Sequence, residues 1–152
     1  MRYKGDIRKA LPEVDSFIAL DGLLQVGQAA LGNDDSLRDI LHEGARPYFL
    51  YDDSMPRHLS SKPHMAYVKI SEGCNRPCAF CIIPQIRGVM RSRSIESIAR
   101  EVQALGAQGV KEMNLVAQDL TAYGTDQKER LVELLRRLDG TNAAKWIRLL
   151  YA

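Results

Sequence analysis

The chain of 152 residues contains little cysteine, a single tryptophan and no long apolar segment. No run approaches the about 18 apolar residues that a membrane-spanning helix needs. The opening residues, MRYKGDIRKALPEVDS, are charged and lack the apolar core of a signal peptide. A net charge of +2 is too small by itself to indicate a surface for nucleic acid. We therefore expect a cytoplasmic protein with no membrane partner, and composition does not indicate a nucleic-acid partner.

All the cysteines lie in one stretch, SEGCNRPCAFCIIP, as Cys74, Cys78 and Cys81. A reducing compartment disfavours a structural disulfide, and an odd number of thiols would leave one unpaired. Three thiolates in one short loop can instead hold a zinc ion or an iron–sulfur cluster. The cysteine pattern therefore favours a metal site over a disulfide.

The choice between zinc and an iron–sulfur cluster depends on the fourth ligand. Structural zinc takes four protein ligands, so a zinc site would need one of His42, His58 or His64. His64 precedes a predicted strand and is expected at the far end of that strand from the cysteines. A cubane cluster held by three thiolates needs no fourth protein ligand, because its last iron can bind a substrate or cofactor. The residues favour the cluster and leave zinc open.

The first part of the chain, residues 1–45, reads as one unit of short elements. It contains a helical pattern that stops before Pro12 and an apolar run, Val14–Leu20, that predicts a strand. Two further helices are predicted over residues 23–31 and 35–44. No residue in this unit indicates chemistry of its own, so its predicted role is packing.

The rest of the chain divides at residue 65. Residues 46–64 are rich in Pro, Ser and Asp and have no apolar period, which predicts an interdomain linker. Over residues 65–152 strands and helices alternate, with Ser94 as the expected N-cap of the first helix. The elements are predicted at residues 65–71, 94–105, 110–117, 128–140 and 146–152. This order implies parallel strands with right-handed crossovers, and hence an α/β fold.

Two loops of this predicted parallel α/β unit suggest a site. Ligands of such folds bind at the carboxyl ends of the strands. The cysteine loop follows the first strand and AQDLTAYG follows the second, so both are expected at that end. The last strand, Trp146–Ala152, is apolar, and three strands cannot close a barrel. We therefore expect a fragment that associates through this uncovered strand.

The spacing Cys-x-x-x-Cys-x-aromatic-Cys after a first barrel strand resembles the radical S-adenosylmethionine (SAM) superfamily. The longer string KISEGCNRPCAFCIIPQIRGVMRSRSIESI resembles the methylthiotransferase family within it. The resemblance implies that Cys74, Cys78 and Cys81 hold a [4Fe-4S] cluster with one open iron, which binds SAM. It also implies that residues 65–152 are the first half of a parallel (β/α) radical SAM barrel, preceded by the C-terminal remnant of an α/β N-terminal methylthiotransferase domain over residues 1–45.

The resemblance further implies contacts to SAM. Phe80 matches the aromatic position that lies against the cofactor, and Ile82 to Pro84 follow where the family lines the adenine site. Gln118 and Asp119 fall where members of the superfamily often place polar groups near the amino group of SAM. From the residues alone, Phe80 could equally be a core residue, and the polar pair could equally cap a turn. No catalytic residue is assigned.

Basic positions of the family motif are matched by Arg87, Arg91 and Arg93, which would otherwise be solvated or pair with carboxylates such as Glu96. The strings VAQDLTAYG and WIRLLYA resemble the branch that adds a methylthio group to the β-carbon of an aspartate in the small-subunit ribosomal protein S-twelve. That branch implies this protein as substrate, a low-potential electron donor, and a second [4Fe-4S] cluster held by an N-terminal region. The tRNA adenosine branch of the family and a zinc-stabilised binding module are the alternatives.

Overall fold

The computed structural model describes residues 4–14, 16–18, 20–31, 49–60 and 62–152, and the chain forms two compact units, Met1–Phe49 and Leu50–Ala152. The first unit contains α1 (Lys4–Ala10), the 3-10 helix η1 (Leu20–Gln25) and α2 (Val26–Ala30). The helix predicted before Pro12 is therefore confirmed.

The strand predicted in this first unit is wrong. The Val14 amide donates a hydrogen bond to the Leu11 carbonyl at 3.3 Å, which closes a turn, and residues 14 and 16–18 are not in a strand. A strand needs a partner, and the described residues of this unit contain no other strand for the apolar run to join. The helix predicted over residues 35–44 lies outside the described residues.

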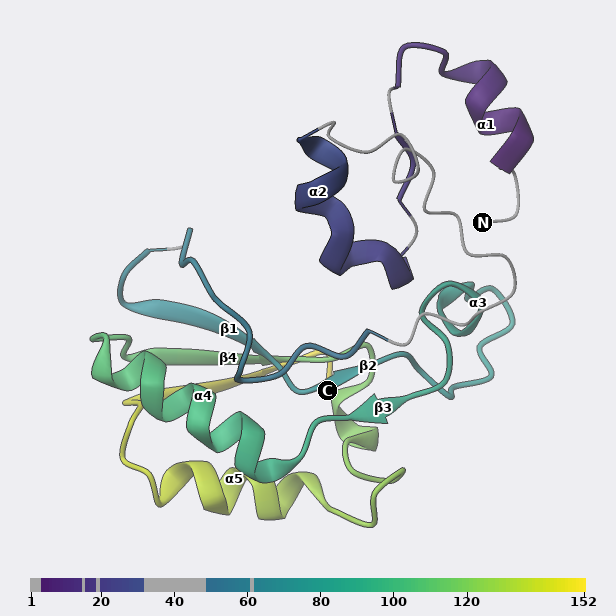
Figure 1. Ribbon diagram of the computed structural model, residues 1–152. Helices are drawn as coiled ribbons and strands as arrows, with labels where there is room; N and C mark the ends of the chain where they lie inside the picture. The colour runs from purple at the N-terminus through teal and green to yellow at the C-terminus, as the bar shows by residue number, and fades with distance from the viewer. Residues whose placement is uncertain (1–3, 15, 19, 32–48, 61) are drawn as a thin grey trace. The chain divides into compact units, whose positions relative to one another are not determined.

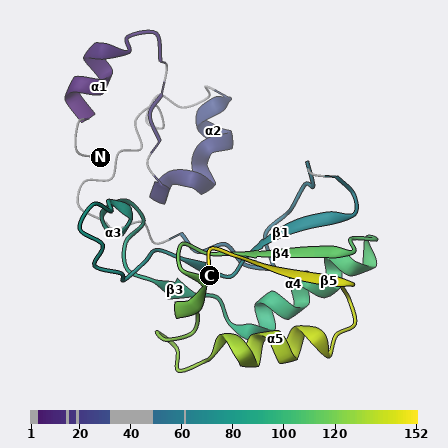
Figure 2. The same cartoon turned by 180° about the vertical axis from the view of Figure 1, so that it is seen from behind.

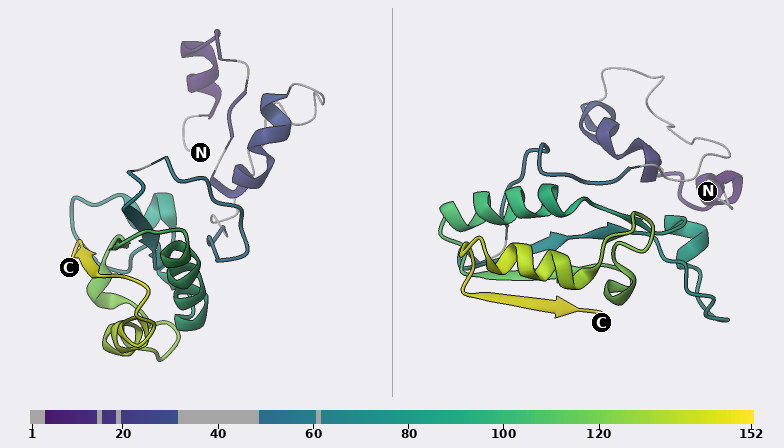
Figure 3. Two further views of the ribbon diagram at one scale, coloured as in Figure 1. Left: turned by 90° about the vertical axis from the view of Figure 1, so that its left-hand side faces the viewer. Right: turned by 90° about the horizontal axis from the view of Figure 1, so that it is seen from below.

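The second unit is built on a parallel sheet. Strands β1 (Met65–Lys69), β4 (Glu112–Val116) and β5 (Trp146–Leu150) lie in that order and run in the same direction (Figures 1 and 2). Helices α4 (Ile95–Ala107) and α5 (Leu131–Asp139) make the two crossovers and lie on one side of the sheet (Figures 1 and 3). The prediction of three parallel strands with helical crossovers is confirmed, as part of a (β/α) barrel.

The core lies between the sheet and these two helices. Because side chains alternate across a strand, every second residue of β1 and β4 faces the helices. The buried apolar side chains of this core include Ala66, Val68, Ile70, Ile98, Ala99, Val102, Leu105, Met113, Leu115, Leu134 and Leu138. The Ser94 side chain accepts a hydrogen bond from the Ser97 amide at 3.3 Å, so its predicted capping role is confirmed.

Several short elements around the cysteine loop were not predicted. Strand β2 (Ser71–Glu72) pairs antiparallel with β3 (Arg91–Ser92), helix α3 (Ile83–Arg87) follows the last cysteine, and the 3-10 helix η3 (Leu120–Ala122) follows β4. Elements of two to five residues are too short to show a period, so the sequence pattern could not reveal them. Within the part of the chain that the structure describes, no helix has the length and apolar character needed to cross a membrane.

Candidate functional site

The three cysteines lie on the loop that leaves the carboxyl end of β1. Cys74 is buried, Cys81 is partly buried and Cys78 is exposed, and all three are free thiols. The Cys81 amide donates to the Cys78 carbonyl at 3.1 Å, which makes a tight turn between the last two cysteines. No disulfide uses these thiols, so all three are available as ligands.

Gly73 lets the start of this loop pack closely against residues 88 and 89, just before β3. The φ of Gly73 is +79°, and a Cβ built there would lie 2.6 Å from the Gly88 carbonyl oxygen and closer still to that of Val89. The Cys74 amide donates to the Gly88 carbonyl at 3.3 Å, and Asn75 Oδ1 accepts from the Met90 amide at 3.0 Å. These contacts fix the first cysteine relative to residues 88–90.

The loop after β4 reaches the cysteine loop through two sets of polar contacts. Gln118 Nε2 donates to Glu72 Oε1 at 3.1 Å. The Arg76 guanidinium forms an ion pair with Asp119 and also donates to Thr121 Oγ1 at 3.1 Å. The structure therefore brings the two loops together at the carboxyl ends of β1 and β4, as the sequence predicted.

The charges at this junction are paired. The Arg76 guanidinium, by hydrogen bonding, holds the pKa of Asp119 below its usual range, and Asp119 in turn raises the pKa of Arg76. Glu72 is buried and forms ion pairs with Lys69 and, at 3.6 Å, with Arg87. Glu72 and Arg76 were missed by the sequence analysis, although both lie inside the cysteine string, residues 71–84, that singled out this loop.

Two buried acceptor oxygens remain without a partner at this edge. Among the described residues, neither Ser71 Oγ nor Gln118 Oε1 has a hydrogen-bond partner. Ser71 follows β1 and Gln118 follows β4, which are adjacent strands. A buried acceptor without a donor is costly, so these oxygens fit a ligand that brings N–H or O–H donors. SAM carries such donors in its amino and ribose hydroxyl groups.

The apolar candidates for SAM contact differ from this polar pair. Phe80 is 94% exposed and Ile82 is 48% exposed, whereas Pro84 is partly buried in α3. The alternative that Phe80 is a core residue is therefore wrong. An aromatic ring left this exposed has apolar surface available for a ligand.

The donor set fits an iron–sulfur cluster better than zinc. Three free thiols in one exposed loop are the ligand type that iron–sulfur clusters use. His64 lies at the opposite end of the sheet, where its carbonyl accepts from the Glu112 amide at 2.9 Å at the start of β4. In the described ranges no three or more His, Cys, Asp and Glu side chains are arranged to hold a metal ion. The thiols thus match the cluster by their chemistry and their common loop, while the three cysteines are themselves not gathered into a metal-binding arrangement in this structure.

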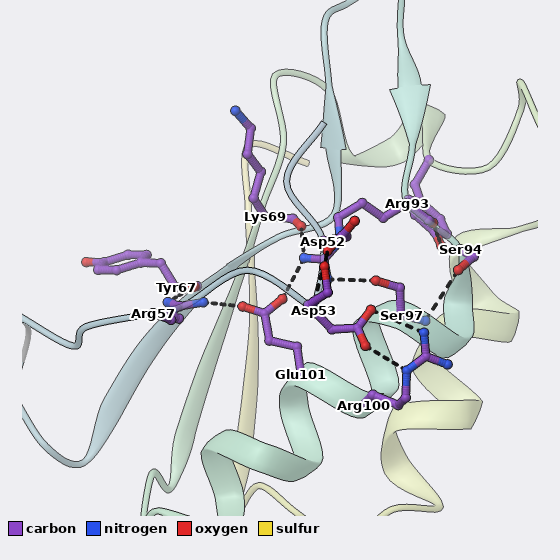
Figure 4. A network of polar contacts seen from close by, with 12 residues as sticks. Asp52, Asp53, Arg57, Tyr67, Lys69, Arg93, Ser94, Ser97, Arg100 and Glu101 are labelled. Atoms are coloured by element: carbon purple, nitrogen blue, oxygen red, sulfur yellow. Dashed lines mark hydrogen bonds and ion pairs between the residues drawn. The ribbon is translucent and has the colours of Figure 1, made fainter. Parts of the chain in front are cut away.

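A buried polar network supports the strand that leads into the cysteine loop (Figure 4). Arg93 is buried and donates to the Lys69 carbonyl at 2.8 Å, to Glu101 at 2.6 Å and to Ser97 Oγ at 3.0 Å. Arg57 forms an ion pair with the same Glu101 and donates to the Tyr67 carbonyl. We call Arg57, Arg93, Ser97 and Glu101 the Glu101 network.

The two carbonyls that this network binds lie on the free edge of β1. In and next to β1, the backbone groups of even-numbered residues form hydrogen bonds with β4. The Ile70 amide, for example, donates to the Val116 carbonyl at 3.0 Å. Tyr67 and Lys69 therefore turn their backbone groups away from β4, where Arg57 and Arg93 meet them. The network satisfies an edge that would otherwise be open and fixes the end of β1 before the cysteines.

The segment predicted as a linker takes part in this support. Residues 50–60 and 62–64 form no helix or strand, but Arg57 belongs to the Glu101 network and Asp53 accepts from Arg100 of α4 at 2.7 Å. The Tyr51 ring lies 5.3 Å from the Arg93 guanidinium.

Glu96 pairs with Arg137 of α5 at 3.0 Å, not with an arginine of the family motif. Sequence patterns missed Glu101 because a lone glutamate on a helix reads as a solvated residue.

Comparison with known proteins gives a consistent result. Residues 68–151 match the profile of the Radical SAM superfamily. The chain is 46% identical to "Ribosomal protein uS12 methylthiotransferase RimO" of Solibacter usitatus, over 99% of this chain and 32% of that protein. The protein of the same name from Syntrophotalea carbinolica is 44% identical over 99% of this chain and 33% of its own length. The one from Koribacter versatilis is 50% identical over 70% of this chain and 21% of its length. The chain thus spans about a third of the length of the first two relatives.

Proposed function

Because the chain belongs to the radical SAM superfamily, whose profile matches more than half of it, we propose that it is part of a radical SAM methylthiotransferase. The proposed substrate is the small-subunit ribosomal protein uS12, at the β-carbon of an aspartate. The observation that carries the proposal is the 46% identity that covers 99% of this chain. The activity is proposed for the whole protein, of which this chain corresponds to the part that holds the cysteine loop.

We propose that Cys74, Cys78 and Cys81 hold three irons of a [4Fe-4S] cluster and leave the fourth iron open to SAM. This assignment is supported by the donor chemistry of three free thiols at the carboxyl edge of a parallel sheet. When bound, the cluster and SAM together supply hydrogen-atom abstraction from an unactivated carbon. Gly73 and Asn75 hold the loop against residues 88–90, so the first ligand is positioned before the cofactors arrive.

For SAM itself we propose two sets of contacts. Gln118 offers an unpartnered buried oxygen for the amino group, whereas Asp119 beside it is already bonded to Arg76 and Thr121. Gln118 is therefore the stronger candidate of the two. Phe80, Ile82 and Pro84 supply apolar surface for the adenine, because Phe80 and Ile82 are exposed beside the last cysteine.

The remaining parts of the proposal concern the whole protein. Residues 1–45 are proposed as the remnant of an N-terminal methylthiotransferase domain, residues 46–64 as the linker and residues 65–152 as the partial barrel. A second [4Fe-4S] cluster, in an N-terminal region beyond these residues, and a low-potential electron donor complete the proposed system. The greater length of the relatives supports this assignment.

Anaerobic reconstitution of the 152-residue chain with iron and sulfide tests the site. We expect about four irons per chain and a brown, oxygen-sensitive chromophore whose electron paramagnetic resonance (EPR) spectrum changes when SAM is added. Tight stoichiometric zinc without that chromophore would favour the zinc-stabilised module instead. The substrate is tested separately, by assaying the full-length protein on uS12 and on tRNA. Modification of tRNA alone would assign the other branch of the family.

A further inference from the structure

Arg76 lies between the first two cysteines, and its side chain crosses to the loop after β4. Its guanidinium pairs with the Asp119 carboxylate and donates to Thr121 Oγ1 at 3.1 Å. The Thr121 hydroxyl donates to Asp119 Oδ1 at 2.7 Å, which closes a triangle of three side chains. We call Arg76, Asp119 and Thr121 the Arg76 latch.

The latch places a cation beside the thiols. Arg76 stands two residues from both Cys74 and Cys78, and its amide donates to Cys74 Sγ at 3.4 Å. The Arg76 side chain is 58% exposed and that of Asp119 13% exposed. The arginine end of this ion pair is largely solvated, which limits the contribution of the pair to folding stability. What it does supply is a fixed charge at the cysteines.

We propose that the Arg76 latch positions the cysteine loop and sets the reduction potential of the cluster bound there. This inference rests on the proposed function, because it requires the cluster. Reduction adds a negative charge to the cluster, so a nearby cation favours the reduced form and raises its potential. Net charge and hydrogen bonds to the sulfurs are among the factors that set such potentials. Asp119 opposes the charge of Arg76. The reduction potential of the cluster should therefore lie below its value with Arg76 alone and above its value with Asp119 alone.

Single substitutions in the latch change the local charge in opposite directions. Arg76→Gln removes a cation and is expected to lower the potential. Asp119→Asn leaves the Arg76 charge uncompensated and is expected to raise it. Arg76→Lys keeps the charge and should stay nearer to the native potential than Arg76→Gln. An exposed arginine paired elsewhere, Arg137, gives the matched control Arg137→Gln, which should leave the potential unchanged.

The measurement is a redox titration of the reconstituted chain, followed by EPR, with iron content determined first. At a fixed solution potential, we expect the ratio of reduced to oxidised cluster to fall about threefold to tenfold in Arg76→Gln; tenfold equals about 59 mV for a one-electron couple. We expect a rise of similar size in Asp119→Asn. Shifts of opposite sign support the inference.

Other outcomes overturn it and are distinguishable. Shifts in the same direction in both variants would mean that either change merely loosens the loop. The absence of a shift in both would remove the electrostatic role. If Arg76→Gln takes up too little iron, Asp119→Asn still decides, since a potential that falls or stays in place contradicts the proposal. Failure of the native chain to form any cluster would overturn the proposed function itself.

Discussion

Two groups of arginines and carboxylates flank the cysteine loop, and they differ in burial. In the Glu101 network, Glu101 is 5% and Arg93 2% exposed, and the two terminal nitrogens of Arg93 donate to three acceptors. In the Arg76 latch, the arginine is 58% exposed. Buried charges must be fully bonded, and removing one partner from them is costly. Exposed pairs contribute little to stability. The same residue types therefore have different roles: stability in the Glu101 network, and the charge at the cysteine loop in the Arg76 latch.

The position of each group agrees with this difference. The Glu101 network binds the free edge of β1 and the first crossover helix, both of which carry the core. The latch joins two loops at the carboxyl edge, beside three thiols of which only Cys74 is buried. We therefore expect changes in the Glu101 network to act on folding, and changes at the cysteine loop to act on the cluster.

Cys78→Ala is expected to show the largest difference between an effect on cluster binding and an effect on folding. Cys78 is exposed and has no core packing to lose, so the fold should be retained while cluster binding is lost. Two thiolates should not hold the cube. Iron content after reconstitution and the far-ultraviolet circular dichroism spectrum measure the two properties. Gln85→Ala, an exposed change in α3, is the control and should keep both. A full complement of iron in Cys78→Ala would show that the ligand assignment is wrong.

The converse is expected for Glu101→Gln. The neutral amide leaves Arg93 buried without a counter-charge, which should lower the free energy of unfolding by about 3 kcal/mol. Urea denaturation of the chain measures this loss. Glu96→Gln on the same helix is the matched control: its pair with Arg137 is exposed, so the midpoint should barely change. Equal small effects in both variants would contradict the importance given to burial.

The sequence predicted the periodic parts of the second unit well. Apolar alternation located β1, β4 and β5 to within a few residues, and Ser94 marked the start of α4, because both signals are local. Predicted ends extended too far, as in the helix expected from residue 128 that begins at Leu131. The wrong strand at Val14–Leu20 has the same origin: a short apolar run shows burial but not a pairing partner.

The polar contacts of the site were largely beyond sequence reasoning. The cysteine spacing and the position of Gln118 could be read directly, since both depend on a strand end. That Arg76 meets Asp119, or that Glu101 meets Arg57, depends on residues 43 and 44 positions apart. A single sequence does not report such pairings. Only the packed sheet determines which charges are buried and which face the loop.

Gly73→Ala tests how far the cysteine loop depends on its backbone. The added Cβ would meet the Gly88 and Val89 carbonyls at a positive φ, so we expect a loss of about 2 kcal/mol or more together with weaker iron retention. Gly109→Ala is the control, because Gly109 also has a positive φ but no atom within 4 Å of a built Cβ. It should cost about 1 kcal/mol and leave iron retention unchanged. Urea denaturation and iron release to a chelator provide the measurements, and equal iron release would show that Gly73 does not position the cysteines.

The smallest expected effect is that of low pH on stability. It acts through two ion pairs: Arg76 with Asp119, which joins the two loops, and Arg100 with Asp53, which holds the segment before β1. Hydrogen bonding from Arg100 lowers the pKa of Asp53, and that from Arg76 lowers the pKa of Asp119, both from an ordinary value of 3.8. A carboxyl whose folded pKa lies below its unfolded value stabilises the fold above the unfolded pKa and loses that contribution as the pH falls through the folded pKa.

Thermal stability should therefore be flat from about pH 7 to about pH 5 and fall below about pH 4. Asp53→Asn should lower the melting temperature slightly at neutral pH and make the decline in acid shallower, because the amide has no proton to gain. Asp6→Asn, at a carboxyl in α1, is the comparison and should leave the slope unchanged. Melting temperatures recorded across this range test the sign. An Asp53→Asn profile parallel to that of the native chain would show that the ion pair with Arg100 contributes nothing to the acid sensitivity.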